Sequence, residues 1–139
     1  MKLKSLAVVT FLATLPLAAV ADQLPIHPGL WKTTTTRTNP MTGQPVTETK
    51  THCVKQTSFD PASMMKNAQG CNLVKNELDG DTLTFRMECN FQGQSASADG
   101  VFQTDGKSGK GNMDVEVDMG QTKMTIMKMN WTSQRIGDC

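Results

Sequence analysis

The sequence predicts an all-β protein, and three observations favour this fold class. Threonine, serine, glycine, asparagine and glutamine are abundant and aromatic residues make up only 5% of the chain, which is typical of short strands joined by polar turns. Apolar and polar side chains alternate in several segments, most clearly over residues 112–119. Turn-forming residues separate these segments. We expect an antiparallel meander of about seven strands, forming a small closed or half-closed barrel with one short helical insertion; the alternative is a two-sheet β-sandwich.

Residues 1–21 have the pattern of a cleavable export signal. Lys2 and Lys4 precede an apolar run over residues 6–15, and Ala19 and Ala21 form the small-x-small pattern that signal peptidase recognises. The apolar run is too short to span a bilayer, so we expect no membrane span after cleavage. Residues 22–139 are then expected to form a single domain in the periplasm or outside the cell.

The first expected hairpin joins a strand over residues 29–38 to one over residues 46–54. Both segments are rich in threonine and other residues that favour strands, and the intervening segment concentrates asparagine, proline and glycine. The next segment, residues 57–69, is the expected helix, of one or two turns. Ser58 or Asp60 can cap it, and proline follows in a position suited to a first helical turn.

A second hairpin is predicted by the Asp-Gly pair at Gly80, which lies between apolar-alternating runs over residues 71–78 and 82–90. A three-residue loop centred on Gly80 would place Cys71 opposite Cys89. Residues opposed on antiparallel strands approach disulfide distance. In the second run one face is expected to carry Leu83, Phe85, Met87 and Cys89.

Three further strands are expected over residues 95–104, 112–119 and 122–135. The middle one directs Met113, Val115, Val117 and Met119 inward; its acidic residues, Asp114, Glu116 and Asp118, are expected to form a solvated face. In the last strand the apolar phase changes between Ile126 and Met127. Such a change predicts a β-bulge or a strand buried on both faces.

Four cysteines in an exported chain predict two disulfides. None of the four lies in a C-x-x-C motif, which argues against a zinc ribbon or a redox-active site.

Charge and histidine placement exclude further classes of function. The chain is near neutral, with no basic stripe that would bind nucleic acid. His27 and His52 do not stand in a catalytic or metal-ligand spacing, so we expect no enzyme and no cofactor.

Ten methionines offer two interpretations. They can fill an irregular core that lacks larger aromatic residues. Alternatively, exported methionines could bind copper(I) through their thioethers. The residues that would do so are Met113, Met119, Met124, Met127 and Met129.

The two tryptophans, Trp31 and Trp131, lie near opposite ends of the mature chain. In a closed meander the first and last strands are neighbours, so the favoured expectation is that the indoles pack together and close the barrel. A hollow interior is the alternative. Its apolar lining would be Trp31, Phe85, Met127, Met129 and Trp131.

The motifs of the mature chain together resemble the bacterial family catalogued as domain of unknown function 3617. The resemblance rests on Pro28-Gly29-Leu30-Trp31 at one end, on the cysteine order, and on Ile136-Gly137-Asp138-Cys139 at the other, and it spans essentially the whole mature chain. Where members often show Gly-Arg-Arg before the last motif, this chain has Ser-Gln-Arg. The resemblance implies an exported envelope protein and carries over no site.

If Cys71 pairs with Cys89, then Cys53 pairs with Cys139 and ties the C-terminus to the second strand; crossed pairings stay open at this point. The sequence thus predicts a monomeric, non-enzymatic binding or accessory protein whose partner is a small apolar ligand or an envelope protein. Copper(I) handling is the alternative.

Overall fold

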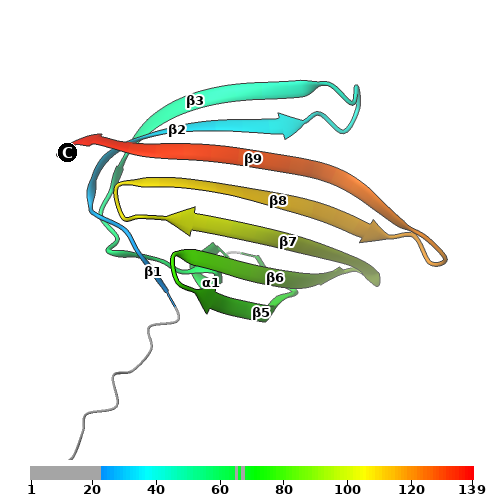
Figure 1. The fold of residues 1–139 in the computed structure, drawn as a ribbon. Coiled ribbons are helices and arrows are strands. Elements are labelled where there is room, and N and C mark those ends of the chain that lie inside the picture. The colour runs from blue at the N-terminus through cyan, green and yellow to red at the C-terminus, as the bar shows by residue number, and fades with distance from the viewer. Residues whose placement is uncertain (1–22, 65, 67) are drawn as a thin grey trace, which may run out of the picture.

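The computed structural model describes residues 23–64, 66 and 68–139. Its main element is one antiparallel sheet of seven strands in the order β3-β2-β9-β8-β7-β6-β5 (Figure 1). The strands are β2 (Gly29–Thr38), β3 (Pro45–Val54), β5 (Cys71–Asp79), β6 (Thr82–Phe91), β7 (Gln94–Thr104), β8 (Ser108–Asp118) and β9 (Lys123–Gly137). Two short strands, β1 (Leu24–Pro25) and β4 (Ser58–Phe59), pair with each other, and the helix α1 (Pro61–Met64) follows β4.

The connectivity confirms the predicted antiparallel, all-β meander with one short helix. Strands β5 to β9 form consecutive hairpins, because each pairs with the next strand along the chain. The β2–β3 hairpin lies on the far side of β9, so that the first long strand pairs with the last. The expected export signal, residues 1–21, lies outside the described residues.

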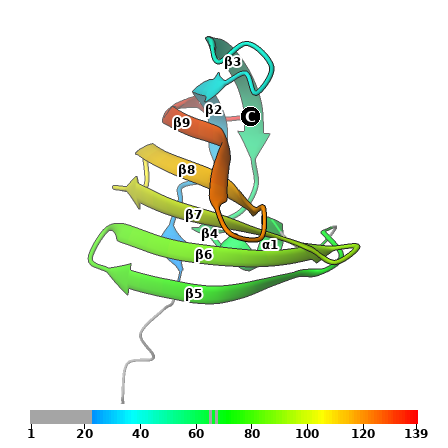
Figure 2. The ribbon, with the colours of Figure 1, turned by 90° about the vertical axis from the view of Figure 1, so that its right-hand side faces the viewer.

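The sheet does not close into a barrel, because β3 and β5 remain its two edges. Figure 2 shows how strongly the sheet twists between β5 and β3, so that the two edge strands run in different directions. The alternative two-sheet sandwich is not formed by the described residues either, since β1 and β4 supply only two residues each. Closure is replaced by a cover of β1, β4 and α1 on one face of the sheet, in which Leu24 of β1 and Phe59 of β4 pack against the buried apolar side chains and α1 contacts β5.

We call the covered face, which carries Leu83, Phe85 and Phe102, the inner face, and the opposite face the outer face. The predicted alternation in β6 is confirmed: Leu83, Phe85 and Met87 are buried, while the residues between them face outward. Two core clusters form on the inner face. One contains Phe85, Met87, Ala98 and Met113; the other contains Leu24, Leu83 and Phe102.

In the β5–β6 hairpin Cys71 lies opposite Cys89, as predicted, but the turn and the strand register differ from the prediction. The turn contains two residues rather than three, because Asp79 already pairs with Thr82. A register shift between Leu73 and Lys75 then restores the expected pairing at the cysteines. The loop prediction is therefore wrong by one residue, and a β-bulge at Val74 compensates for the error.

Strand β9 contains the predicted β-bulge. Met127 pairs with Val115 but Thr125 pairs with Glu116, so Ile126 is the extra residue at the predicted phase change. Consequently Met124, opposite Val117, returns to the face that carries Met127. The prediction for Met119 is wrong: β8 ends at Asp118, and Met119 lies in the following turn with 57% of its surface exposed.

The predicted helix forms as a single turn. The Asp60 carboxylate accepts a hydrogen bond from the Ala62 amide (2.9 Å), and Pro61 occupies the first helical position. Ser58 and Phe59, expected in the helix, instead form β4 and pair with Pro25 and Leu24. No helix in the part of the chain that the structure describes has the length and apolar character required to cross a membrane.

Both cysteine pairs lie at disulfide distance. Cys71–Cys89 joins the neighbouring strands β5 and β6, and Cys53–Cys139 joins the end of β3 to the C-terminus across a sequence separation of 86 residues. The crossed pairings are therefore not formed.

Candidate functional site

The candidate site is a hollow of about 390 Å³ on the inner face, between the β2–β3–β9 part of the sheet and the cover. The cover packs closely over β6 and β7, where Leu24 and Phe59 contact Leu83 and Phe102. It extends less far toward β2 and β3, and the hollow lies there. Its apolar lining comes from Ile26, Trp31, Val54, Phe59, Phe102, Met129 and Trp131.

Aromatic rings form a continuous row beside the hollow. Phe59 of the cover lies with its ring centroid 4.4 Å from that of Phe102 and 6.4 Å from that of Phe85. Phe102 in turn stacks with Trp131 at a centroid distance of 6.2 Å. Trp131 thus stacks on Phe102, lies over Gly111 of β8 and also lines the hollow.

Trp31 is fixed by a different contact. Its indole nitrogen donates a hydrogen bond to the His27 carbonyl oxygen (2.9 Å), and only 4% of the residue is exposed. The His27 amide in turn donates to the Gly106 carbonyl, 2.9 Å away, so the segment before β2 is anchored to the β7–β8 turn. The position of Trp31, which forms one wall of the hollow, therefore depends on these hydrogen bonds to the backbone as well as on side-chain packing.

The expected packing of Trp31 against Trp131 is replaced by a shared hollow. Trp31 pairs with Arg135 and Trp131 pairs with Thr35, so the indoles lie four residues apart along β2. Both line the hollow, and Trp131 stacks on Phe102 rather than on Trp31.

Polar groups are distributed over the floor and rim of the hollow. On the floor the hydroxyl groups of Thr33 and Ser133 hydrogen-bond to each other across β2 and β9 (2.8 Å). The rim carries His52 of β3, Gln56 and Asp60. The Asp60 carboxylate already accepts the helix-capping hydrogen bond from Ala62. The hollow thus combines an apolar wall with a few hydrogen-bonding groups.

Three of the five residues predicted to line a hollow do so: Trp31, Met129 and Trp131. Phe85 does not, because its ring lies against Gly100 of β7 and is 1% exposed. Met127 packs partly against the core and lines a separate recess near the β2–β3 loop. The other apolar lining residues, Ile26, Val54, Phe59 and Phe102, were not predicted from the sequence. The sequence signal for Phe59 is that it is the one aromatic residue in residues 57–69, the segment assigned to the helix.

Four of the methionines considered for copper, Met113, Met124, Met127 and Met129, share the inner side of β8 and β9 but are spread along it. Met113 pairs directly with Met129, and Met127 lies one residue pair further along the inner face. Met124 follows beyond the bulge. Met119, at the turn, accepts a weak hydrogen bond from the Gln94 side chain (3.9 Å). Within residues 23–64, 66 and 68–139 no three His, Cys, Asp or Glu side chains are grouped so as to hold a metal ion.

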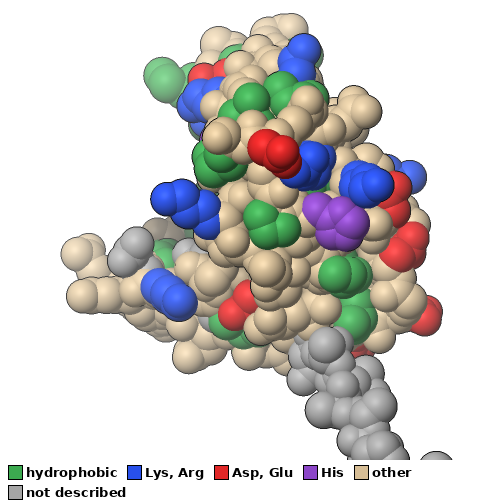
Figure 3. All heavy atoms as spheres, turned by 90° about the vertical axis from the view of Figure 1, so that its left-hand side faces the viewer, with side chains coloured by type: hydrophobic (Ala, Val, Ile, Leu, Met, Phe, Trp, Pro, Cys, Tyr) green, Lys and Arg blue, Asp and Glu red, His purple; other side chains and the backbone are tan. Residues whose placement is uncertain are grey.

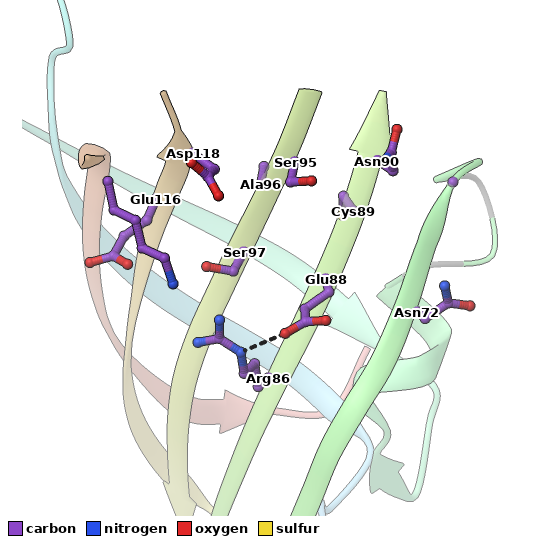
Figure 4. Close-up of a pocket in the computed structure, with 12 residues that line it drawn as sticks. Asn72, Arg86, Glu88, Cys89, Asn90, Ser95, Ala96, Ser97, Glu116 and Asp118 are labelled. Carbon is purple, nitrogen blue, oxygen red and sulfur yellow. Dashed lines mark hydrogen bonds and ion pairs between the residues drawn. The ribbon is translucent and has the colours of Figure 1, made fainter. Parts of the chain in front are cut away.

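A second concavity, of about 350 Å³, lies on the outer face of β6 to β8 and is polar (Figure 4). Arg86 contacts Asp99 (2.5 Å) and Glu88 (3.2 Å), and these hydrogen bonds, that with Asp99 first, raise the pKa of Arg86 above its ordinary value. The acidic residues Glu116 and Asp118 border the same concavity together with Lys123. The charges of both signs in this concavity lie close together, and Arg86 already forms ion pairs with Asp99 and Glu88. Few of its charged groups are therefore free to bind a ligand, and the hollow is the better candidate site.

The surface near the C-terminus carries charges of both signs. In Figure 3 Lys and Arg side chains alternate with Asp and Glu over this end of the molecule, with small apolar areas between them. This face has no extended region of one sign.

Comparison with known proteins identifies the family. No match to the chain was found among curated proteins or among solved structures. The model of a family described as proteins of unknown function, DUF3617, matches residues 26–139. This match runs from the first residue lining the hollow to the C-terminal cysteine. The chain therefore belongs to the DUF3617 family.

Proposed function

We propose that this protein is an exported, non-enzymatic binding protein of the bacterial cell envelope that holds a small apolar or amphipathic molecule in the hollow. The observation that carries the proposal is the hollow itself, whose walls are two tryptophans, Phe59 and Met129. Ligand sites are typically concave, mostly apolar and of a few hundred Å³, with few polar groups to orient the ligand. The hollow has these properties.

The placement in the envelope is supported by the N-terminus and by the cysteines. Residues 1–21 have the n-region, apolar run and cleavage pattern of an export signal. The two cysteine pairs at disulfide distance require an oxidising compartment to persist. Both features fit the periplasm or the exterior of a bacterial cell.

The chemistry of the lining defines the ligand class. Flat indole and phenyl surfaces favour an apolar body, such as an acyl chain or a ring system. The hydroxyl pair of Thr33 and Ser133 and the rim groups of His52 and Gln56 can bind one polar end. A non-enzymatic role is proposed because the carboxylate at the rim, Asp60, already caps α1 and the serine hydroxyls of the lining have hydrogen-bond partners other than His52. Ser58 donates to the Gln23 side chain, Ser63 donates to the Asp60 carbonyl, and Ser133 bonds with Thr33.

The test compares two neighbouring residues that lie on opposite faces of β2. Thr35 lines the hollow, whereas Thr34 lies on the outer face and hydrogen-bonds with Thr49 (3.0 Å). Thr35→Phe should fill the hollow and weaken binding of the fluorescent apolar probe N-phenyl-1-naphthylamine at least tenfold. Thr34→Phe should leave the affinity unchanged.

Native mass spectrometry of the mature protein provides the second measurement, since it reports bound molecules directly. A small amphipathic molecule that is retained by the wild type and lost in Thr35→Phe supports the proposal. The proposal is wrong if the wild type binds neither the probe nor a cellular molecule, or if both substitutions reduce binding equally.

Copper(I) handling remains the second candidate because Met113 and Met129 are directly opposed and Met127 lies beside them. Thioether sulfurs are ligands that copper(I) accepts. Titration against a competing copper(I) chelator should then give an affinity tighter than micromolar, weakened by Met113→Leu with Met129→Leu. Met41→Leu, in the β2–β3 loop and 94% exposed, is the matched control. An affinity weaker than micromolar would exclude this function.

A further inference from the structure

The strand β3 is a long and regular edge of the sheet. It pairs with β2 over ten consecutive residue pairs without a register shift, and all of its residues except Val54 are exposed. The opposite edge differs, because β5 is interrupted by the bulge at Val74. Bulges are one of the means by which proteins prevent edge strands from pairing with other chains. The described part of β3 has no such interruption.

The hydrogen-bond phase of β3 restricts how another strand can join it. In the loop, the Asn39 amide donates to the Gln44 carbonyl (2.8 Å), and Pro45 then has no amide hydrogen to donate. Because bonded and non-bonded pairs alternate in an antiparallel ladder, even-numbered residues of β3 bond to β2. The outward amides and carbonyls belong to Thr47, Thr49, Thr51 and Cys53. Two copies of β3 can therefore pair antiparallel only when odd-numbered residues face odd-numbered residues.

Charge selects one of the allowed registers. Pairing centred on Thr49 places Glu48 of each copy opposite Lys50 of the other, so that two complementary pairs form about the two-fold axis. The neighbouring allowed registers place Glu48 opposite Glu48 or Lys50 opposite Lys50, and directly opposed like charges are unfavourable. In one chain the two side chains already meet at 3.1 Å, which shows that both reach the same region of the edge.

We propose that β3 is a dimerisation edge, through which two copies of this chain pair antiparallel about Thr49 and join their sheets into one continuous sheet. A self-complementary patch of this kind is what a two-fold interface requires. This inference goes beyond ligand binding and does not depend on it. It replaces the monomer expected from the sequence.

The pairing extends both faces of the sheet. On the outer face, the threonine hydroxyl pairs Thr34–Thr49 (3.0 Å) and Thr36–Thr47 (2.9 Å) continue into the threonines of the second copy. On the inner face, Val46 of the second copy lies opposite His52, which lines the hollow. Val46 is 39% exposed in the single chain, and pairing covers it while adding an apolar side chain beside the rim.

The experiment exchanges the charges of the edge. In the mature, disulfide-bonded protein, Glu48→Lys or Lys50→Glu alone creates two like-charge pairs across the two-fold axis and should raise the dimer dissociation constant at least tenfold. The double variant Glu48→Lys with Lys50→Glu restores complementarity and should dimerise as the wild type does. Sedimentation equilibrium over a range of protein concentrations measures the dissociation constants.

The other edge provides the matched control. Lys75 and Glu77 of β5 form the same kind of ion pair two residues apart (3.4 Å), so Glu77→Lys should leave dimerisation unchanged. The substituted side chains are exposed, and circular dichroism checks that the variants are folded. The proposal is overturned if the wild type is monomeric up to millimolar concentration. It is equally overturned if a wild-type dimer is insensitive to the single charge reversals.

Discussion

Arg135 lies against the backbone of Gly29 and joins the start of β2 to the end of the chain. A Cβ atom on Gly29 would come within 2.5 Å of Arg135 Nε and of the Gly137 carbonyl oxygen. Arg135 Nε also donates a hydrogen bond to the Pro28 carbonyl (2.8 Å), and its guanidinium contacts the Asp138 carboxylate. The two motifs on which the family resemblance rests are therefore in direct contact.

Replacement of Gly29 by alanine tests this contact. Gly29 has φ of +149°, a conformation that side-chain-bearing residues rarely adopt, and the new methyl group would collide with backbone as well as with Arg135. We expect Gly29→Ala to lower the free energy of unfolding by about 3 kcal/mol. Urea denaturation of the disulfide-bonded protein measures the change.

Gly137→Ala is the control, since it lies in the same contact region but has no atom within 4 Å of a built Cβ. Its effect should stay within about 1 kcal/mol. Equal losses for the two variants would show that the loss at Gly29 does not arise from the close approach of Arg135.

The two disulfides should differ in their contribution to stability. In the chain-entropy model the stabilisation grows with the length of the closed loop, and the sequence separations are 86 for Cys53–Cys139 and 18 for Cys71–Cys89. Replacing both cysteines by serine should therefore cost about 4.5 kcal/mol for the first pair and about 3 kcal/mol for the second. Guanidinium denaturation of the two double variants compares them. A larger loss for Cys71–Cys89 would contradict the prediction.

The strands could be predicted from the sequence because alternation and turn residues are local signals. The bulge in β9 was predictable for the same reason, since Ile126 and Met127 break the apolar period in the sequence itself. The bulge at Val74 was not, because nothing in the local pattern distinguishes Val74 from its neighbours in β5. Local sequence patterns also could not predict whether the sheet closes into a barrel. Closure requires β3 to pair with β5, and this depends on the summed twist of all seven strands and on the segments that cover one face.

The hollow was only partly predictable because it depends on which aromatic rings are covered. Phe85 and Trp131 alternate into the same face, and no sequence period separates them. Phe85 is buried because β4 brings Phe59 over it, with ring centroids 6.4 Å apart. That contact comes from a segment whose strand is two residues long and whose signals favour a helix.

Asp105, in the β7–β8 turn, should make stability depend on pH. Its carboxylate accepts hydrogen bonds from the amides of Ser108 (2.7 Å) and Lys107 (2.9 Å), which lower the pKa of Asp105 below its ordinary value of 3.8. The ionised form is thus favoured in the folded state. Its stabilisation is present above the ordinary pKa and is lost as the pH falls through the lowered folded value.

Asp105→Asn removes the charge and provides the comparison. Urea denaturation between about pH 2.5 and about pH 7 should show the wild type more stable at neutral pH, with the difference shrinking below about pH 4. NMR titration of the Asp105 carboxyl group should give a pKa below 3.8. A difference between the two proteins that stays constant over this range would contradict the prediction.

Gly111 controls the position of Trp131 and hence the shape of the hollow. The two residues are paired across β8 and β9, and a Cβ atom on Gly111 would overlap the indole ring and lie 2.8 Å from the Val101 carbonyl oxygen. In Gly111→Ala the indole ring must leave its present position, and the backbone at Val101 must also give way. We expect a loss of about 1–3 kcal/mol in the free energy of unfolding, a shift in tryptophan fluorescence and weaker binding of the apolar probe. Gly109→Ala, whose Cβ would meet the edge of Phe102 at 3.0 Å, should have a smaller effect on all three measurements. If Gly111→Ala binds the probe as the wild type does, then close approach at Gly111 is not what holds Trp131 in the wall of the hollow.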